Sequence, residues 1–223
     1  MSMKVFVIHY KKLVERKASI LRQFERFGIT DYEFIDIDRS DIDNYEITRY
    51  CNKVHLFPAQ IAILLSHIEA YRRIVANNYA EALILEDDVI LSDDFMVKYD
   101  RYHDELYAEP EFDMLFFGNG CNLHIQQHRQ IKGKHIYHKC VEYTHWGGFG
   151  STRCVDSYLV SLSCACKICE YVADMSNKPI VSITIDHWLN DVARDKKLMV
   201  FWAEPTIVTQ SSTDDARCYD SHM

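Results

Sequence analysis

Residues 82–91 read Ala-Leu-Ile-Leu-Glu-Asp-Asp-Val-Ile-Leu, so three consecutive carboxylates separate two apolar runs. The first run is short and continuously apolar, which is typical of a strand buried on both faces of a parallel sheet. Carboxylates that follow such a strand lie at the carboxyl edge of the sheet, where open α/β folds bind their ligands. This stretch therefore predicts an α/β fold with a binding site at the end of one strand.

The segments before this stretch predict the same fold. Residues 4–9 (KVFVIH) and 32–37 (YEFIDI) are short runs rich in strand-forming residues. Between them, the apolar residues of 12–27 recur at helical spacing, and Gly28 follows as a typical helix end. A strand, a helix and a strand in this order predict a βαβ unit, which implies a mostly parallel sheet.

The rest of the chain continues the alternation of helices and strands. The pattern predicts helices over 58–75, 95–107, 157–172 and 186–194, strands over 112–117 and 198–203, and an extended segment over 180–185. The polar span 121–145 predicts a loop or hairpin, and the residues from about 213 predict a loose C-terminal tail. We find no repeat or linker, so residues 1–223 are predicted to form a single domain.

Length and composition restrict the class of protein. The chain has 223 residues and a net charge of −8, which argues against an extended nucleic-acid surface because phosphate binding needs clustered Lys and Arg. No apolar run approaches the ~20 residues of a membrane helix, and the first apolar stretch is too short for a secretion signal. We therefore expect a cytoplasmic protein without a transmembrane segment, whose 8 cysteines are mostly free thiols.

The carboxylates Glu86, Asp87 and Asp88 are costly between apolar runs unless something compensates them. In an extended segment alternate residues point the same way, so Glu86 and Asp88 could face one cleft and Asp87 the opposite side. Such hard oxygen ligands suit Mg²⁺ or Mn²⁺, which usually complete their coordination shell with substrate phosphates. The cluster indicates a metal-diphosphate site; the alternative is a helix start that forms a solvated face with Asp93 and Asp94.

Six parts of the chain resemble, in the same order, glycosyltransferase family 25. That family includes bacterial lipooligosaccharide galactosyltransferases, collagen hydroxylysine galactosyltransferases and related sequences of large DNA viruses. The matching parts are VFVIHYKKLVERKASILRQFERFGI followed by YEFIDID, AILLSHIEAYR (62–72), ALILEDDVILSDDF (82–95), STRCVDSYLVS (151–161), ITIDHWLND (183–191) and FWAEPTIVTQSS (201–212). The likeness extends over roughly residues 4 to 212, and the ordered set is much more specific than the acidic segment alone.

The resemblance implies a glycosyltransferase A fold, a Rossmann-like α/β/α sandwich that binds a nucleotide-sugar, usually with Mn²⁺. It implies a metal-dependent, inverting enzyme that moves galactose or glucose from a UDP-sugar to a hydroxyl of a glycan, a lipooligosaccharide or a collagen-like hydroxylysine. If the chain is viral, its expected location is the host cytoplasm. Two segments depart from the family pattern and affect the donor-base contacts. Residues 60–65 read Gln-Ile-Ala-Ile-Leu-Leu where an acidic-Gly-Cys sequence often precedes Ser-His, and the opening strand ends in His9-Tyr10 instead of Asn-Leu.

Several residues near the predicted strand ends are candidates for holding the nucleotide-sugar. Asp88 is the first candidate for metal ligand, and Glu86 for contacting ribose, or the metal directly or through water. Asp87 becomes a second ligand if the turn rotates it inward. Arg16 suits phosphate and base contacts, with a surface charge as the alternative. Asp36 could hold ribose hydroxyls or belong to a solvated turn.

Five further residues are candidates for donor contacts because of the resemblance or their setting. His9 ends the first strand, and Ser66 and His67 lie on an apolar helix, where a histidine is otherwise a satisfied core residue. Trp146 and Gly148 belong to a loop suited to stacking on a sugar ring, because paired glycines allow a mobile lid. Packing is the alternative for that loop.

Asp186 is the candidate catalytic base, because an inverting transfer needs a carboxylate or a histidine to take the proton of the acceptor hydroxyl. It follows the apolar residues 180–185 and is expected at a strand end, with the N-cap of the next helix as an alternative or additional role. His187 could complete the metal shell or bind a phosphate, or be a partly buried helix histidine.

Two other functions are compatible with the same residues. A metal-dependent phosphohydrolase or nucleotidyltransferase would use the same carboxylates, and it predicts a second acidic cluster at a strand end. A non-catalytic sugar-binding relative is the other possibility, because residues 60–65 depart from the family pattern.

Overall fold

The computed structural model describes residues 3–139, 142–143 and 149–211. The candidates Trp146 and Gly148 and the predicted tail lie outside the described residues. In chain order the elements are β1 (Val5–Ile8), α1 (Val14–Phe27), β2 (Tyr32–Ile35), η1 (Ile42–Asn44), η2 (Glu46–Tyr50), α2 (Pro58–Asn77), β3 (Glu81–Glu86), β4 (Val89–Leu91), α3 (Phe95–Tyr107), β5 (Met114–Phe116), η3 (Gly120–Asn122), η4 (Gln127–Arg129), β6 (Ile136–Lys139), β7 (Glu142–Tyr143), β8 (Phe149–Gly150), β9 (Ser157–Ser161), α4 (Leu162–Ala173), η5 (Met175–Asn177), α5 (Ile185–Lys196), β10 (Val200–Ala203) and β11 (Val208–Gln210).

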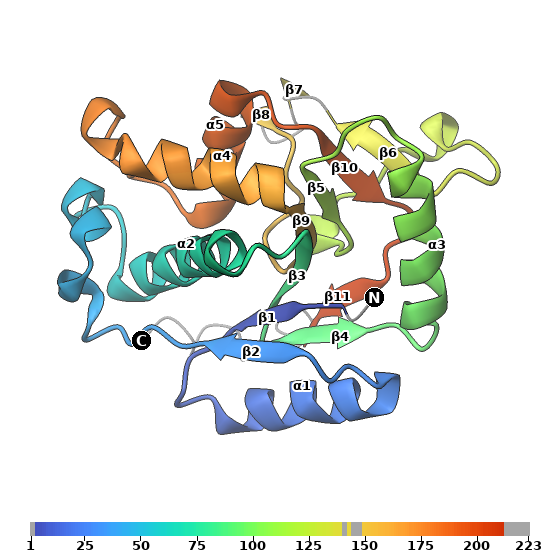
Figure 1. The fold of residues 1–223 in the computed structure, drawn as a ribbon, viewed down its shortest axis with the longest axis horizontal. Helices are drawn as coiled ribbons and strands as arrows, with labels where there is room; N and C mark the ends of the chain where they lie inside the picture. Colours follow the sequence, from blue (N-terminus) through green and yellow to red (C-terminus); the bar gives the residue numbers. More distant parts are fainter. Residues whose placement is uncertain (1–2, 140–141, 144–148, 212–223) are drawn as a thin grey trace.

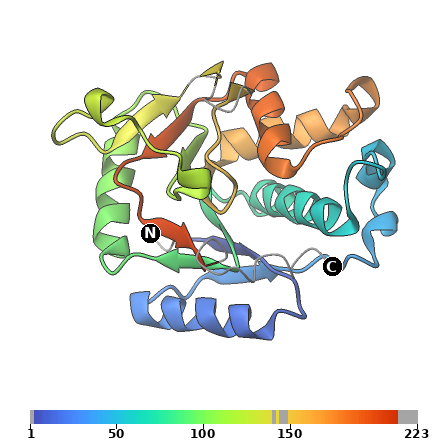
Figure 2. The same ribbon diagram turned by 180° about the vertical axis from the view of Figure 1, so that it is seen from behind.

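A seven-stranded, mostly parallel sheet forms the centre of the fold. Its strand order is β2-β1-β3-β9-β5-β10-β6. All of its strands run in one direction except β9 and β6, which are antiparallel to their neighbours. Helices α2, α4 and α5 cover one face, and α1 and α3 cover the other (Figures 1 and 2). The predicted α/β/α sandwich of glycosyltransferase A type is confirmed.

Each face of the sheet contributes to its own apolar core. In β3, Ala82 and Ile84 pack toward α2, α4 and α5, whereas Leu83 and Leu85 pack toward α1 and α3. All four side chains are at most 1% exposed. Burial on both faces explains why this strand reads as an unbroken apolar run rather than as an alternating one.

The ends of several helices follow from local sequence. The helix α1 ends at Gly28, which adopts φ 66° and donates its N–H to carbonyls of the last turn; glycine takes this left-handed conformation at no steric cost. The helix α2 begins at Pro58, where the missing N–H costs nothing, and Gln60 accepts the N–H of Phe57 at 2.9 Å. In the described ranges, no helix has both the length and the apolar character that crossing a bilayer requires.

The prediction of one helix over 157–172 is wrong for its first five residues. Residues Ser157–Ser161 form β9 in the middle of the sheet, between β3 and β5, and only then does α4 begin. Ser161 caps α4, because its Oγ accepts the N–H of Cys164 at 3.1 Å. The strand passes directly into the helix without a turn, so the apolar pattern is continuous across both.

The predicted extended segment over 180–185 is not a strand. Only Val181 makes a ladder contact, an isolated bridge to Cys51, and α5 already begins at Ile185. Asp186 therefore lies in the first turn of α5 and not at a strand end. It is not the N-cap either, because that position is Thr184.

Residues after the acidic triplet and in the polar span also form strands. Residues Val89–Leu91 form β4, which pairs with β11 in a separate two-stranded sheet, so the acidic triplet does not begin a helix. The span 121–145 includes β6, which pairs with β10 at the edge of the main sheet.

Candidate functional site

A cavity of about 280 Å³ opens at the carboxyl ends of β1 and β3. One part of its wall is apolar and comes from the start of α1, the segment after β2 and the first half of α2. The other part is polar and includes His9, Arg16 and the acidic triplet. The side chains that line it are those of Ile8, His9, Tyr10, Leu13, Arg16, Ile37, Arg39, Ala59, Gln60, Ala62, Ile63, Ser66, Glu86, Asp87, Asp88 and Gln210.

All three acidic side chains of residues 86–88 line this cavity. Glu86 is the last residue of β3, and Asp87 and Asp88 form the turn that leads to β4. The carboxylate of Asp87 pairs with Nδ1 of His9 at 2.7 Å and with Nη1 of Arg16 at 3.1 Å. Of the two alternatives for Asp87, the structure has the inward one, because the strand ends at Glu86 and the turn rotates the next residue toward the cavity.

Arg16 lines the cavity together with a second arginine, Arg39. Nη1 of Arg16 lies 3.1 Å from Asp87 and 3.4 Å from Oδ2 of Asp88. Burial by itself would lower the pKa of Arg16, but the attraction of Asp88 and Asp87 outweighs it and raises that pKa. The guanidinium therefore balances part of the acidic charge, and it lies where a phosphate group of a ligand could bind it.

A further carboxylate, Asp156, lies beside the triplet. It directly precedes β9, and its carbonyl accepts the N–H of Glu86 at 2.8 Å. Its side chain is 1% exposed, and burial together with repulsion from Asp88 raises its pKa to about 7. Sequence reasoning missed this residue; the signal was an aspartate that only Ser157 separates from the hydrophobic run Tyr158–Val160.

The carboxylates around the cavity are the candidate ligands for a divalent cation. Oδ1 of Asp88 and Oδ2 of Asp156 are buried and have no hydrogen-bond partner among the described residues. Burial and then repulsion from Asp88, Asp186 and other carboxylates raise the pKa of Glu86 well above its usual range. In the described part of the chain, no three His, Cys, Asp or Glu side chains are already gathered as ligands. The residues fit a cation that takes some of its ligands from substrate and water, as Mg²⁺ and Mn²⁺ do.

Asp186 approaches the same group of carboxylates from α5. It is half-buried, and its Oδ1 accepts the N–H of Val155 at 3.1 Å. It lies close enough to Glu86 to contribute to the raised pKa of that residue. His187 is exposed on the same helix and does not line the cavity.

Asn190 holds the loop before β9 against the start of α5. Its Oδ1 accepts the N–H groups of Ser151 and Thr152 at 2.7 and 2.9 Å. Its Nδ2 and Oγ1 of Thr152 both donate to the carbonyl of Asp186. Sequence reasoning did not find this contact, because it joins two segments that are far apart in the chain.

The other candidates are divided between the cavity wall and its surroundings. Ser66 lines the cavity, and its Oγ donates to the carbonyl of Ala62 at 2.8 Å. His67, the next residue of α2, is fully buried and lies outside the lining. Asp36 is exposed and also outside the lining, which the same segment reaches through Ile37 instead.

The family comparison agrees with the fold and with the acidic segment. A family model described as "Glycosyltransferase family 25 (LPS biosynthesis protein)" matches residues 2–189. The chain belongs to glycosyltransferase family 25. Membership confirms the resemblance of its segments to that family.

Curated relatives of this family 25 chain come from insects, and each is named "Glycosyltransferase 25 family member". They include proteins of Aedes aegypti (23% identical over 243 residues), Drosophila melanogaster (24% over 126) and Anopheles gambiae (22% over 153). The alignments cover 97%, 52% and 64% of this chain, but 37%, 21% and 26% of the relatives. The chain therefore spans less than two-fifths of the length of these relatives.

We expect Gly118→Ala to destabilise this family 25 chain by about 1–3 kcal/mol, the usual cost of overpacking a buried site. A Cβ at position 118 would lie 2.6 Å from Cγ of Asp156 and still closer to its oxygens. Urea unfolding measures the change. In an Asp156→Ala background the same substitution should cost much less, and an equal cost in both backgrounds contradicts the contact.

The buried carboxyl of Asp156 predicts a pH dependence of stability. Its pKa is raised from 3.8 to about 7, so the folded state binds this proton more tightly than the unfolded state does. The resulting contribution to the free energy of unfolding is complete below pH 3.8 and is lost as the pH rises toward 7. Asparagine has the same shape and does not titrate. In EDTA, the free energy of unfolding of the wild type should therefore fall by about 2–3 kcal/mol from pH 5 to pH 7, relative to that of Asp156→Asn. Unfolding curves that give parallel pH profiles for the two proteins contradict this prediction.

Proposed function

We propose that this chain is a metal-dependent, inverting hexosyltransferase that acts as one catalytic domain. It would move galactose or glucose from a UDP-sugar to a hydroxyl of a glycan, a lipooligosaccharide or a collagen-like hydroxylysine. The observation that carries the proposal is the buried Oδ1 of Asp88, which has no hydrogen-bond partner in the described part of the chain and lies at a cavity that Arg16 also lines. A carboxylate for a cation beside an arginine for phosphate suits a nucleoside diphosphate.

The two parts of the cavity wall would bind the two ends of the donor. Arg16 binds a phosphate oxygen, and the apolar part formed by residues such as Leu13 and Ile63 accommodates the base. Glu86 accepts a hydrogen bond from a ribose hydroxyl, and Asp88 holds Mn²⁺ or Mg²⁺. When bound, the cation neutralises charge on the departing diphosphate.

Asp186 would act as the base that takes the proton of the acceptor hydroxyl. The N–H of Val155 holds its Oδ1, which leaves the second oxygen to receive the proton. Asn190 and Thr152 fix the backbone carbonyl of Asp186 and so limit the movement of its helix turn. A fixed base beside the donor favours direct displacement at the anomeric carbon, which inverts its configuration.

One observation keeps a second function in consideration. A phosphohydrolase or nucleotidyltransferase predicts a second acidic cluster at a strand end. The single carboxylate of Asp156 precedes β9 beside Asp88, and its Oδ2 has no hydrogen-bond partner among the described residues. Asp93, by contrast, is 90% exposed and pairs with Arg26. The two functions differ in the product that they release.

In the deciding experiment, the protein is incubated with UDP-galactose or UDP-glucose, with and without Mn²⁺. The amounts of UDP and of inorganic phosphate released are then measured. UDP release that requires the metal and rises with a hydroxyl acceptor supports the transferase. Phosphate release from simple nucleotides without sugar transfer supports the hydrolase. UDP binding without any turnover, after glycan and hydroxylysine acceptors have been tried, supports a non-catalytic sugar-binding protein.

A further inference from the structure

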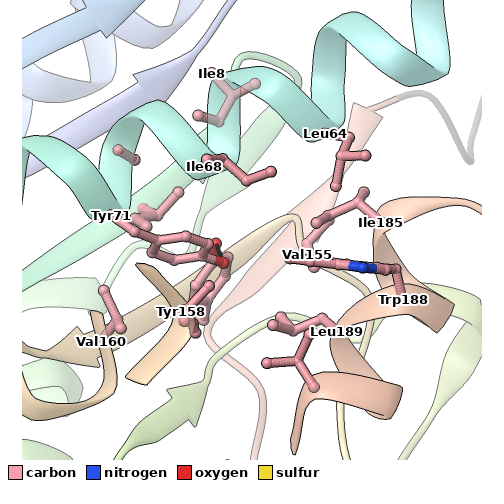
Figure 3. Packing of buried hydrophobic residues seen from close by; sticks show 14 of the residues in the cluster. Ile8, Leu64, Ile68, Tyr71, Val155, Tyr158, Val160, Ile185, Trp188 and Leu189 are labelled. Atoms are coloured by element: carbon pink, nitrogen blue, oxygen red, sulfur yellow. Dashed lines mark hydrogen bonds between the residues drawn. The ribbon is translucent and has the colours of Figure 1, made fainter. Parts of the chain in front are cut away.

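Three buried side chains form a hydrogen-bonded chain behind the cavity wall. His67 and Tyr71 come from α2 and Tyr158 from β9, and all three are 0% exposed. Nδ1 of His67 lies 2.8 Å from the hydroxyl of Tyr158, which lies 2.6 Å from the hydroxyl of Tyr71. Figure 3 shows the two tyrosines meeting within an apolar cluster that includes Ile68 and Val160. Polar groups buried in this way are costly unless each one is paired.

The other ring nitrogen of His67 faces the candidate site. Its Nε2 lies 3.7 Å from Oε1 of Glu86 and has no hydrogen-bond partner among the described residues. Burial lowers the pKa of His67 to about 3, so the ring is neutral and carries a proton on only one nitrogen. The position of that proton decides what His67 offers to Glu86.

The hydrogen-bonded chain favours one position of the proton. If Nδ1 carried it, Tyr158 would have to accept from His67 and donate to Tyr71. The proton of Tyr71 would then have no acceptor in the described part of the protein, and a lone pair on Nε2 would face Glu86. If Nε2 carries it, Tyr71 donates to Tyr158, Tyr158 donates to Nδ1, and the Nε2–H points at the carboxylate. Only this arrangement pairs every donor once Glu86 moves slightly closer.

We propose that His67 is a positioning residue, which donates Nε2–H to Glu86 and fixes that carboxylate as an acceptor for a donor hydroxyl. This role rests on the proposed function only for the identity of the group that Glu86 binds, a hydroxyl of the sugar-nucleotide donor. The need for such a partner is physical, because the neighbouring carboxylates of Asp88, Asp156 and Asp186 repel Glu86. A neutral donor on the side away from the cavity orients Glu86 without adding a cation that would bind those carboxylates instead.

The first test reads the position of the proton directly. In protein labelled with ¹⁵N-histidine, a long-range ¹H–¹⁵N spectrum distinguishes protonated from unprotonated ring nitrogens, and the loss of signals in His67→Gln assigns the residue. We expect a protonated Nε2 and an unprotonated Nδ1 at pH 7, and a shift toward protonated Nδ1 in Tyr158→Phe. A wild-type ring that is protonated on Nδ1, or on both nitrogens, overturns the proposal. This spectrum needs no nucleotide and no activity.

The second test separates positioning from general stability. His67→Phe removes the donor at similar volume and should raise the KM for the UDP-sugar about tenfold, with kcat within about twofold, since a bond to a charged group is lost. His67→Gln retains an N–H donor and should recover most of the loss. His103→Phe is the matched control, because His103 pairs with Glu81 at the other end of β3, at 2.6 Å, away from the cavity. We expect its KM to stay unchanged.

Each outcome of the second test is informative. A folded His67→Phe protein with an unchanged KM overturns the positioning role, as does an equal loss in His67→Gln. If the His67→Phe variant does not fold, the same comparison of KM with kcat is made for His67→Gln and Tyr158→Phe. A changed KM with an unchanged kcat in Tyr158→Phe then supports the positioning role, and an unchanged KM overturns it. If even the wild type shows no turnover, the proposed function fails, and the proton position of His67 is still decided by the spectrum.

Discussion

Asp88→Asn should lower kcat/KM for sugar transfer by about 10³-fold or more and should remove its dependence on Mn²⁺. Asparagine keeps the shape of the side chain but not its charge, so a cation loses its anionic ligand while the turn between β3 and β4 keeps its form. A loss of about 10³-fold in kcat/KM corresponds to about 4 kcal/mol of transition-state stabilisation. This is in the range expected when an electrostatic contact to the leaving group is lost.

The assay for Asp88→Asn is UDP release over a titration of Mn²⁺, with thermal unfolding to verify that the variant is folded. Asp93→Asn is the matched control, because Asp93 lies five residues along the chain, is 90% exposed and pairs only with Arg26 among the contacts of the described residues. Activity of Asp88→Asn within tenfold of the wild type, with the same response to Mn²⁺, would rule out Asp88 as the metal ligand.

Asp186→Asn should lower kcat by about 10²–10⁴-fold, the usual contribution of a general base, while the binding of UDP with Mn²⁺ stays close to that of the wild type. The amide oxygen can still accept the N–H of Val155, so the local structure is expected to persist. The loss of turnover without a loss of nucleotide binding distinguishes this variant from Asp88→Asn.

Single-turnover transfer to an acceptor measures the chemical step of Asp186→Asn, and calorimetry measures nucleotide binding. Asp191→Asn, one turn further along α5, is the control, because Asp191 pairs with Arg194 on the surface of the helix. A transfer rate for Asp186→Asn within threefold of the wild type means that another group takes the proton. Asp156, with its raised pKa, is then the next residue to replace.

Local sequence predicted the parts of the fold that local forces determine. The helix over 95–107 begins and ends where its apolar spacing does, and α1 stops at Gly28 because glycine accepts a left-handed conformation there. The run Ala82–Leu85 was identified as a buried strand because both of its faces are apolar. The acidic triplet was placed at the cavity for the same reason, since it follows that strand directly.

The errors arose where pairing between distant segments decides the structure. Residues 157–161 have the apolar content of a buried helix as much as that of a strand, and only their ladders to β3 and β5 select the strand. Asp156 was overlooked for the same reason, because its nearness to Glu86 depends on the antiparallel direction of β9. The side of Asp87 was left open between two alternatives, because a turn, unlike a strand, does not alternate its side chains.

The antiparallel insertion of β9 also affects how the protein is made. Without β9 the main sheet would divide into β2-β1-β3 and β5-β10-β6, because in the described part of the chain no other strand of that sheet joins the two groups. During synthesis, β3 therefore keeps an unpaired edge until Ser157–Ser161 leave the ribosome, some seventy residues later. An unpaired apolar edge invites pairing with other chains. The nascent protein is thus expected to depend on chaperones, until the arrival of one short segment joins the two halves.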